Sequence, residues 1–538
     1  MSRYPVLAAS AVVLALTLFL TWPQALHLRT QVVPHNDAYF SMWRLGWIAH
    51  AVGTSPRHLY DANIYHQERR TLAYSDAIVL EGAVAAPLIW SGFRTVFVYN
   101  VLLLCGITLS GIAMFVLARY LTGNTSAALV SAVIFTIVPY RIEHYMHLEL
   151  QWTMWVPLAF WAAHRAIEEQ SWSFGLLCGV FVWFQLLSSI YYGVFLALLL
   201  AVLGVLLIAS NRDRRPKSFA VLTLGGIVAG LLAVPYALPY VENARTLGPR
   251  DLGEVSTFSA RWASYVTAPY QNWMWGWTAD RFNGEELRLM PGVVAAALAA
   301  VGLLGRRGRV VFVYGVVCLV GIELSLGLNG HLYPALIRLV PPLRGLRAVA
   351  RVSILALAAL SVLAGFGIQY LQEHVATTRA REWIAASAVI LLVLECGSAP
   401  IRLTEVPSAT PDVYRFLQQL PAGAVVELPM SEPHWIPGFD AVYQYWSMTS
   451  WYPLVNGYSG YASAPYIEIL RRMLAFPDDD SIRLLKSLNV RYVLVHQGLY
   501  DKRSQFVDLM LRMAGRTELV PLGRYRDWLS DTAVFTLQ

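Results

Sequence analysis

A carboxylate that could transfer a proton follows the first apolar block of the sequence, Pro5–Trp22. His35, Asn36 and Asp37 open an amphipathic stretch whose large apolar residues recur at helical spacing on one face: Phe40, Trp43, Trp47 and Ala51. Beside the membrane, Asp37 could act as a general base that takes the proton of an attacking hydroxyl group. The alternative is that Asn36 or Asp37 only caps the helix, because both residue types are common N-caps.

A second polar group lies between two later apolar blocks, in the segment 140–149. Arg141 and His144 could bind a phosphate there, and the spacing of His144 and His147 places both rings on one helical face. Glu143 would complete a set of three metal ligands, but a histidine pair alone is weak evidence for a metal site. We therefore expect no metal, and we keep an interfacial polar loop as the alternative to substrate contact.

Arginines gather at the start of the tenth apolar block: Arg338, Arg344, Arg347 and Arg351. The planar guanidinium fork matches phosphate oxygens, and three of these arginines share one helical face, so the candidate phosphate ligands are Arg344, Arg347 and Arg351. Pairing with Asp or Glu, or extension of the side chains to lipid headgroups, is the alternative.

Aromatic side chains occur at two predicted outer segments. Tyr191 and Tyr192 follow a pair of serines, and their rings could stack on a substrate or anchor the chain at the membrane interface. The same two interpretations apply to a later group, Tyr270, Trp273, Trp275 and Trp277. For the polar residues inside apolar blocks we expect hydrogen bonds between helices; these residues are Gln185, Glu323 and Glu395.

Eleven apolar blocks must position these residues. The 538-residue chain is 57% hydrophobic and only 14% charged, whereas a soluble domain carries about 25% charged residues. The sequence therefore predicts a mainly α polytopic membrane bundle of about eleven transmembrane helices. The blocks are Pro5–Trp22, Arg94–Ala118, Ser126–Val138, Trp152–Ile167, Phe174–Ser188, Tyr191–Ile208, Phe219–Leu238, Met290–Leu304, Val310–Leu328, Val349–Tyr370 and Trp383–Cys396.

The basic residues give an orientation. If the N-terminus is cytoplasmic, the short inside loops contain dense basic groups, as the positive-inside rule requires. These groups are Arg119, His164, Arg165, Arg212, Arg214, Arg215, Lys217, Arg306, Arg307, Arg309, Arg379 and Arg381. The arginines at the start of the tenth apolar block then lie on the outer side, against this bias. The two long segments 25–93 and 239–289 then lie outside. The apolar piece Ala77–Trp90 is short and contains Glu81, so we interpret it as interfacial rather than spanning.

The last part of the chain has the pattern of a small α/β domain. Helices are expected at Asp412–Leu420 and Ser481–Leu488, and strands at Ala424–Leu428 and Val490–Val495. We thus expect two domains, a transmembrane domain over 1–397 that carries the outer loops 25–93 and 239–289, and an extracytoplasmic α/β domain over 398–538.

Several function classes are not supported by the sequence. There is no P-loop, no dinucleotide-binding glycine pattern and no HExxH motif. The chain has only three lysines, so its net charge of +7 does not indicate nucleic-acid binding. All four cysteines lie in apolar blocks and none follows Cys396, so we expect no disulfide in the C-terminal domain.

The succession of elements resembles the GT-C superfamily of polyprenyl-phosphate-sugar-dependent glycosyltransferases. The resemblance rests on an apolar first helix, a long outer loop with the early acid Asp37, many further spans and an extracytoplasmic tail. The stretch 454–461, Leu-Val-Asn-Gly-Tyr-Ser-Gly-Tyr, is similar to bacterial membrane proteins of GT-C type whose reactions are mostly unassigned. Many members carry paired acids in the first loop, whereas Asn36 stands beside Asp37 here, which argues against a metal requirement.

The resemblance implies a function that can be stated as an expectation. The protein would lie in the cytoplasmic (inner) membrane and move a sugar from a polyprenyl-phosphate donor to a glycan, lipid or protein acceptor on the outer face. Asp37 would be the catalytic base, and no cofactor is expected. The alternatives are a non-catalytic assembly or binding protein and a transporter of lipid-linked glycans.

Overall fold

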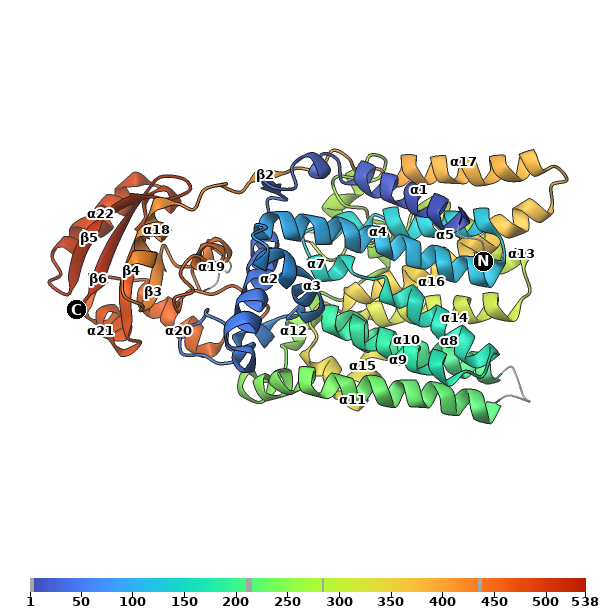
Figure 1. Ribbon diagram of the computed structural model, residues 1–538, viewed down its shortest axis with the longest axis horizontal. Coiled ribbons are helices and arrows are strands. Elements are labelled where there is room, and N and C mark those ends of the chain that lie inside the picture. Colours follow the sequence, from blue (N-terminus) through green and yellow to red (C-terminus); the bar gives the residue numbers. More distant parts are fainter. Residues whose placement is uncertain (1–3, 210–214, 283–284, 434–437) are drawn as a thin grey trace. The chain divides into compact units, whose positions relative to one another are not determined.

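The computed structural model describes residues 4–209, 215–282, 285–433 and 438–538 (Figure 1). Two residues of a predicted inside loop, Arg212 and Arg214, lie outside the described residues. The chain divides into two compact units. Unit 1 contains Met1–His27, Asn100–Leu238 and Gly248–Arg402, and unit 2 contains Leu28–Tyr99, Pro239–Leu247 and Leu403–Gln538.

Each of the eleven apolar blocks forms a helix. Because a helix satisfies its own backbone hydrogen bonds, it is the element that long apolar segments adopt in a membrane. The helices are α1 (Tyr4–Leu20), α4 (Thr95–Thr122), α5 (Thr125–Ile137), α8 (Trp155–Glu168), α9 (Trp172–Ser188), α10 (Ile190–Ala209), α11 (Arg215–Leu247), α13 (Val293–Gly305), α14 (Arg309–Ser325), α16 (Ser353–Glu373) and α17 (Thr378–Cys396).

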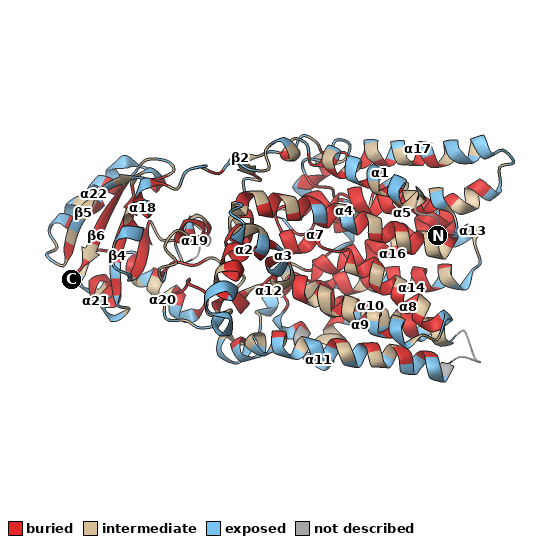
Figure 2. Cartoon of the chain, viewed as in Figure 1, coloured by how far each residue is buried: buried red, intermediate tan, exposed pale blue. Residues whose placement is uncertain are grey.

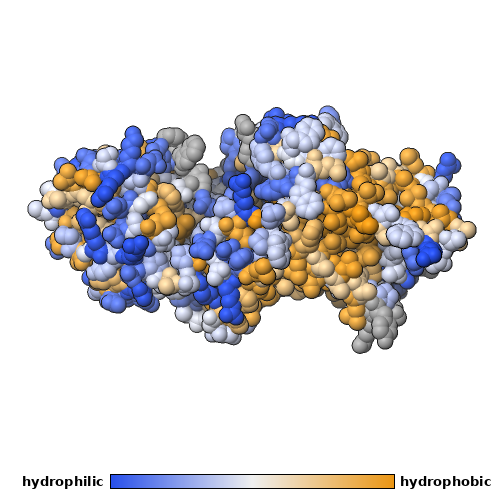
Figure 3. Space-filling view, turned by 90° about the horizontal axis from the view of Figure 1, so that it is seen from above, coloured by the Kyte–Doolittle hydropathy of each residue, from blue (hydrophilic) through white to orange (hydrophobic). Residues whose placement is uncertain are grey.

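Five segments of the described chain are both long and apolar enough to cross a membrane. They are Thr95–Thr122, Thr125–Glu143, Ile190–Ala209, Pro216–Leu247 and Val349–Glu373. The other helices of the set are shorter or less apolar over their length. Figure 3 shows hydrophobic side chains over the surface of the helical part of the chain, as expected for a surface that faces lipid.

Helix α16 is the centre of unit 1. It is almost entirely buried (Figure 2) and packs against α5, α13 and α14. Glycines permit the closest of these approaches. A Cβ atom on Gly302 would lie 2.2 Å from the Leu363 carbonyl oxygen, and one on Gly367 would lie 2.0 Å from the Leu298 carbonyl oxygen. Small residues at such crossings bring helix backbones together in membrane proteins.

Short helices connect the long ones of unit 1. They are α6 (Tyr140–Glu143), α7 (Leu148–Gln151), α12 (Leu252–Thr257) and α15 (Leu332–Leu339). A 3-10 turn at Val349–Val352 leads into α16 and carries Arg351.

Unit 2 contains a four-stranded mixed sheet in the order β3-β4-β6-β5. Strands β3 (Ala424–Leu428) and β4 (Val490–His496) are parallel, whereas β5 (Leu519–Arg526) and β6 (Asp531–Leu537) pair antiparallel. Apolar side chains from the four strands and from α20 (Ala464–Met473), α21 (Asp479–Ser487) and α22 (Arg503–Ala514) form one core. Unit 2 also contains α18 (Asp412–Gln419) and α19 (Asp440–Ser447). The predicted order of helices and strands agrees with these elements.

The segment after the first apolar helix also belongs to unit 2. It forms β1 (Gln31–Val32), α2 (Asn36–Thr54) and α3 (Val79–Trp90), the last of which matches the short apolar piece at 77–90. Strand β1 pairs with β2 (Thr404–Glu405), and α2 packs against α19. These contacts explain why the division of the structure differs from the predicted boundary at 397/398, since the first long loop folds with the tail.

Candidate functional site

Asp37 lies in the first turn of α2, in unit 2. His35 is the N-cap residue, and its Nδ1 accepts a hydrogen bond from the Asp37 backbone N–H over 3.1 Å. The capping interpretation of Asn36 and Asp37 is therefore wrong, because His35 has that role and Asn36 is the first helical residue. The Asp37 side chain is 16% exposed.

Tyr458 donates to the Asp37 carboxylate, and His35 lies beside it. The Tyr458 hydroxyl donates to Oδ1 over 2.9 Å, and the His35 Nδ1 atom lies 3.3 Å from Oδ2. The Tyr458 ring also meets the Phe40 ring edge to face, with centroids 5.3 Å apart. A carboxylate fixed by a donor on one oxygen is pre-oriented, which is what a general base needs.

The segment that carries Tyr458 is attached to the sheet by Asn456. The Asn456 side chain accepts from the Glu427 N–H over 2.8 Å and donates to the Glu427 carbonyl over 3.0 Å, so it pairs with β3 like a neighbouring strand. Farther along, the Tyr458 N–H donates to Gln444 on α19 over 3.0 Å. These bonds fix the course of the segment on both sides of residue 457.

Gly457 is required by a close approach. A Cβ atom at this position would lie 2.5 Å from Cε1 of Tyr65, which belongs to the loop that follows α2. Tyr65 in turn donates its hydroxyl to the Tyr461 carbonyl over 3.2 Å. The glycine and asparagine of the stretch 454–461 thus have structural roles, and Tyr458 is the member of this stretch that reaches Asp37.

A buried ionic network adjoins the stretch 454–461. His496 on β4 is bonded through Nε2 to Glu427 (2.8 Å) and through Nδ1 to Asp527 (3.0 Å). Burial alone would lower the pKa of His496, but these two carboxylates raise that pKa above its ordinary value. Asp440 accepts a hydrogen bond from Asn456, and burial of this carboxyl raises its pKa to about 6.

In unit 1, Glu286 lies at the centre of a polar cluster, and we name His144, His147, Glu286 and Arg351 the Glu286 cluster. Arg351 Nε contacts the two Glu286 oxygens at 3.1 and 2.8 Å, and Arg351 Nη2 also bonds Glu286. His144 Nδ1 and His147 Nε2 lie 3.7 and 3.9 Å from the same carboxylate. All four side chains are buried. His144, His147 and Arg351 were each singled out from the sequence, and all three side chains lie around the Glu286 carboxylate.

Burial and pairing set the charges of this cluster. Burial would raise the pKa of the Glu286 carboxyl, but the Arg351 guanidinium holds that pKa well below its usual range. Burial lowers the pKa of His144 to about 3, so this imidazole is neutral near pH 7. Neither ring nitrogen of His144 has a hydrogen-bond partner among the described residues. An unsatisfied buried imidazole is a ready acceptor or donor for a ligand.

Two imidazoles and one carboxylate could hold a metal ion. The ligand atoms of His144, His147 and Glu286 all lie within 4.8 Å of one another. Nitrogen and oxygen donors of this kind suit zinc and related metals. Both Glu286 oxygens, however, already accept from Arg351, and a guanidinium repels a cation. As arranged, the residues fit a cation poorly, and no step of the chemistry is assigned to one.

The two predicted tyrosines border this cluster. The Tyr191 ring lies 5.3 Å from the Arg351 guanidinium, and its hydroxyl accepts from the Arg347 N–H over 3.1 Å. The Tyr192 hydroxyl lies 2.7 Å from that of Tyr140. They are thus neighbours of the arginines, although neither contact identifies a substrate.

Arg344 and Arg347 are more accessible than Arg351. Arg347 pairs with Glu254 at 3.0 Å, and its side chain is 34% exposed. Arg250 lies 3.5 Å from the other Glu254 oxygen, and its N–H donates to the Arg344 carbonyl. The Arg344 guanidinium donates only to backbone carbonyls among the described residues. The pairing alternative therefore applies to Arg347 and Arg351, whereas Arg344 retains an unneutralised charge in the described part of the chain.

Arg141 faces a different environment. It is fully buried and donates to the Phe135 carbonyl, the Gln151 side chain and the Thr153 hydroxyl. Its neighbour Glu143 pairs with Arg288 at 3.2 Å instead of joining the histidines. These bonds organise the turn between α5 and α8, and they leave substrate contact by Arg141 as a prediction from the sequence alone.

Two acids in apolar blocks form the hydrogen bonds between elements that the sequence predicts. Glu395 near the end of α17 accepts from the first N–H groups of α13, at Val293 (2.5 Å) and Val294 (2.9 Å). Glu323 on α14 accepts from Leu332 at the start of α15 over 3.3 Å. Both carboxylates therefore satisfy free N–H groups at helix N-termini.

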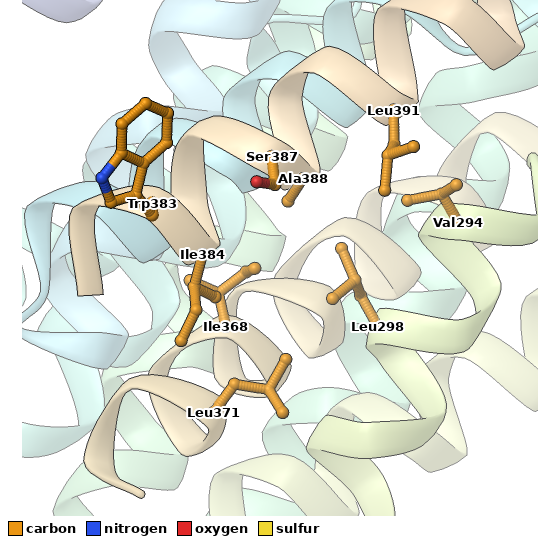
Figure 4. Close-up of a pocket in the computed structure, with 9 residues that line it drawn as sticks. All are labelled: Val294, Leu298, Ile368, Leu371, Trp383, Ile384, Ser387, Ala388 and Leu391. Atoms are coloured by element: carbon orange, nitrogen blue, oxygen red, sulfur yellow. The ribbon is translucent and has the colours of Figure 1, made fainter. Parts of the chain in front are cut away.

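The apolar cavity of Figure 4 is not connected with this chemistry. It has a volume of about 390 Å³ and lies between α13, α16 and α17. Its lining contains no titratable side chain; the residues are Val294, Leu298, Ile368, Leu371, Trp383, Ile384, Ser387, Ala388 and Leu391. A cavity of this composition suits a hydrocarbon chain rather than proton transfer.

Three residues of these sites were not singled out in the sequence. Glu286 and Glu254 lie in the long segment 239–289, where only the aromatic residues had drawn attention. Because this segment and the arginines before the tenth apolar block are both predicted on the outer side, its acids could have been proposed as partners of those arginines. Tyr458 belongs to the stretch 454–461, but nothing in its spacing indicates a contact with Asp37.

Comparison with known proteins identifies the fold. No protein-family model and no curated protein matches the sequence. The mycobacterial arabinofuranosyltransferase AftD superposes with a TM-score of 0.68 at 13% identity, over 100% of this chain and 40% of AftD. The oligosaccharyltransferase AglB of Archaeoglobus fulgidus, solved with an inhibitory peptide and a dolichol-phosphate, gives 0.57 at 12% identity, over 99% of this chain and 74% of AglB. The fold is that of the GT-C superfamily.

The GT-C fold confirms the resemblance predicted from the order of the elements. It also agrees with a multi-pass membrane protein, as the apolar helices indicate. The chain spans less than half of AftD, and the identities are too low to carry a reaction over from either enzyme. The likeness is one of fold, and the chemistry has to come from the residues of this chain.

Proposed function

We propose that this protein is a GT-C glycosyltransferase that moves a sugar from a polyprenyl-phosphate donor to an acceptor on the outer face of the cytoplasmic membrane. The observation that carries the proposal is the Asp37 carboxylate, which accepts a hydrogen bond from the Tyr458 hydroxyl over 2.9 Å. A base at the start of a helix that follows the first membrane helix is accessible to a substrate whose reacting group lies at the headgroup level.

The bond changes are those of a direct displacement. An acceptor O–H gives its proton to the Asp37 carboxylate while the acceptor oxygen forms a bond to the anomeric carbon. The bond from that carbon to the phosphate oxygen breaks, and polyprenyl phosphate leaves. One base and one displacement invert the anomeric configuration, by analogy with inverting glycosidases.

The arginines are assigned to the phosphate. Arg344 and Arg347 are the accessible guanidinium groups, and guanidinium forks bind phosphate oxygens in pairs. Arg351 is bound to Glu286, and its guanidinium lies 5.3 Å from the Tyr191 ring. In this assignment Arg344 and Arg347 stabilise the leaving phosphate.

The test supplies the purified protein in liposomes with a polyprenyl-phosphate sugar that carries one label on the sugar and another on the lipid. A transferase separates the labels, because the sugar becomes covalently attached to an acceptor and the lipid phosphate is released. A transporter of lipid-linked glycans moves both labels together across the bilayer. If the labels stay joined with every donor and with a membrane extract as acceptor source, the proposal fails.

A further inference from the structure

A second, basic pocket lies at the other end of α16. It has a volume of about 530 Å³ and is formed by the loop between α13 and α14 together with the last turns of α16. Its polar wall contains Arg306, Arg307, Arg309 and His374. A cavity of this size is in the range of small-molecule sites, and no step of the proposed transfer uses it.

The length of α16 fixes the depth of this pocket in the membrane. The helix has 21 residues, and at 1.5 Å per residue it is about 31 Å long. This is close to the ~30 Å thickness of the hydrocarbon core. Arg351 precedes the first turn of α16, whereas Tyr370, Glu373 and His374 are at its end. The pocket therefore lies at the headgroup level of the leaflet opposite to Arg351.

The charges of the pocket are only partly neutralised. Arg306 pairs with Glu373, and Arg309 donates to the Leu207 carbonyl at the end of α10. Arg307 is exposed and has no ion pair among the described residues. His374 donates its Nδ1–H to the Tyr370 carbonyl over 2.8 Å, so its Nε2 atom takes no part in this bond. The local balance is positive, with three guanidinium groups and one carboxylate in the lining.

The remaining wall is apolar. Leu121 at the end of α4, Val310 and Val311 on α14, and Phe366 on α16 line the same cavity. A wall of this kind next to arginines matches a ligand that is anionic at one end and hydrocarbon at the other. Basic pockets between membrane helices on the inner side are known to bind anionic lipid headgroups.

We propose that the pocket bounded by Arg306, Arg307 and Phe366 binds the phosphate headgroup of an anionic membrane lipid. The guanidinium groups contact the phosphate oxygens, and the first carbons of the acyl chains lie against the apolar wall. Inner-face arginines that only set the orientation of the chain would not need a cavity, and they would not distinguish one phospholipid from another.

The experiment measures lipid binding to the delipidated protein in detergent by native mass spectrometry. The probes are phosphatidylglycerol, phosphatidylcholine and inorganic phosphate. We expect phosphatidylglycerol to bind at least tenfold more tightly than phosphatidylcholine, which carries the same phosphate diester but no net charge. The variant R306Q/R307Q should lose this preference, and R306K/R307K should retain most of it.

The control is R379Q/R381Q, which removes two arginines from the start of α17 on the same predicted face but outside the pocket. It should bind phosphatidylglycerol like the unmodified protein. Equal binding of the two lipids, equal losses in both glutamine variants, or binding of inorganic phosphate as tight as that of the lipid would each overturn the proposal. Lipid binding is read directly, so its outcome is independent of sugar transfer.

Discussion

The Tyr458 hydroxyl donates a 2.9 Å hydrogen bond to the Asp37 carboxylate. The contact joins residues that are 421 positions apart in the sequence, one in the helix after the first membrane helix and the other in the C-terminal part of unit 2. Asn456 and Gln444 fix the segment that carries Tyr458, so the donor is supplied by a rigid element. A C-terminal residue therefore takes part in orienting the proposed base.

Replacement of Tyr458 by Phe should slow transfer without weakening substrate binding. The variant removes one hydrogen bond to a charged group, which contributes about 1.5–3 kcal/mol. We expect kcat to fall about tenfold or more and KM to change little, because the hydroxyl touches the base and not the substrate. Steady-state kinetics with a labelled lipid-linked sugar measure both parameters.

The control for this prediction is Tyr525→Phe, which removes a tyrosine hydroxyl from β5 in the same unit. Its kcat should equal that of the unmodified protein. An unchanged kcat in Tyr458→Phe would mean that the bond to Asp37 has no part in catalysis.

The buried pair of Arg351 and Glu286 should dominate the stability of the Glu286 cluster. Removal of one partner leaves an uncompensated buried charge, which costs about 3–5 kcal/mol. Arg351→Gln and Glu286→Gln should each lower the thermal unfolding temperature strongly, and the double variant should be less destabilised than the sum of the two. Thermal unfolding in detergent, followed by tryptophan fluorescence, gives the three values.

A surface pair provides the comparison. Arg512 and Asp508 form an exposed i, i+4 contact on α22, for which about 0.3–0.5 kcal/mol is usual. Arg512→Gln should hardly change the unfolding temperature. If Arg351→Gln were equally harmless, the buried pairing would contribute nothing to the fold.

Removal of divalent metals should leave the transfer reaction intact. Arg351 occupies both oxygens of Glu286, which is the carboxylate that a cation would need beside His144 and His147. We expect equal rates before and after treatment with EDTA. Loss of activity that manganese or zinc restores, together with loss of metal binding in His144→Gln, would assign a metal to these residues instead.

The His496 network should make the stability of unit 2 depend on pH in two directions. The pKa of His496 is raised in the folded state, so its contribution is complete below the unfolded value of about 6.5 and is lost as the pH rises through the folded value. Bonds to His496 and to backbone N–H groups overcome burial and lower the pKa of Asp527 to about 2, so its contribution is lost as the pH falls from about 4 towards 2.

The unfolding temperature should therefore be highest near pH 5–6, at about the midpoint between these two transitions. Trp528, whose ring centroid lies 5.1 Å from that of His496, is a local fluorescence reporter. In His496→Gln the decrease at alkaline pH should disappear. The control His58→Gln changes an exposed histidine of the same unit and should retain the full profile. An unchanged profile in His496→Gln would show that another group is responsible.

Local pattern predicted the eleven apolar helices and, in the last part of the chain, α18, β3, α21 and β4, but not α19, α20, α22, β5 or β6. A long uninterrupted apolar run predicts a helix, and all eleven apolar blocks form one. Short runs rich in β-branched residues between turn residues predict strands, and two of them form β3 and β4. Contacts between distant segments were not predictable in this way. The pairing of β1 with β2 and the packing of α2 on α19 place the first loop in unit 2, and no periodicity of a single segment contains that information.

The same distinction applies to the site. His144 and His147 were singled out for their helical spacing in a polar segment and Arg351 as a member of an arginine group, and these three side chains do converge. Glu286 was overlooked because an acid in a polar loop has no unusual feature until its partner is known. Likewise His35 replaces Asn36 as the cap, since capping depends on backbone conformation, which residue type alone does not determine.

Asp37→Asn tests the central claim most directly. The asparagine amide has the shape of the aspartate carboxylate but cannot take the proton of the attacking hydroxyl group. The variant therefore separates base catalysis from structure. The measurement is the initial rate of sugar transfer from a labelled polyprenyl-phosphate donor in liposomes, with Asp61→Asn, an exposed acid of the same loop, as the control. We predict that Asp37→Asn loses at least a hundredfold in rate while Asp61→Asn stays within twofold of the unmodified protein, in line with the usual 10²–10⁴ contribution of a general base. Transfer at the full rate by Asp37→Asn would contradict the account.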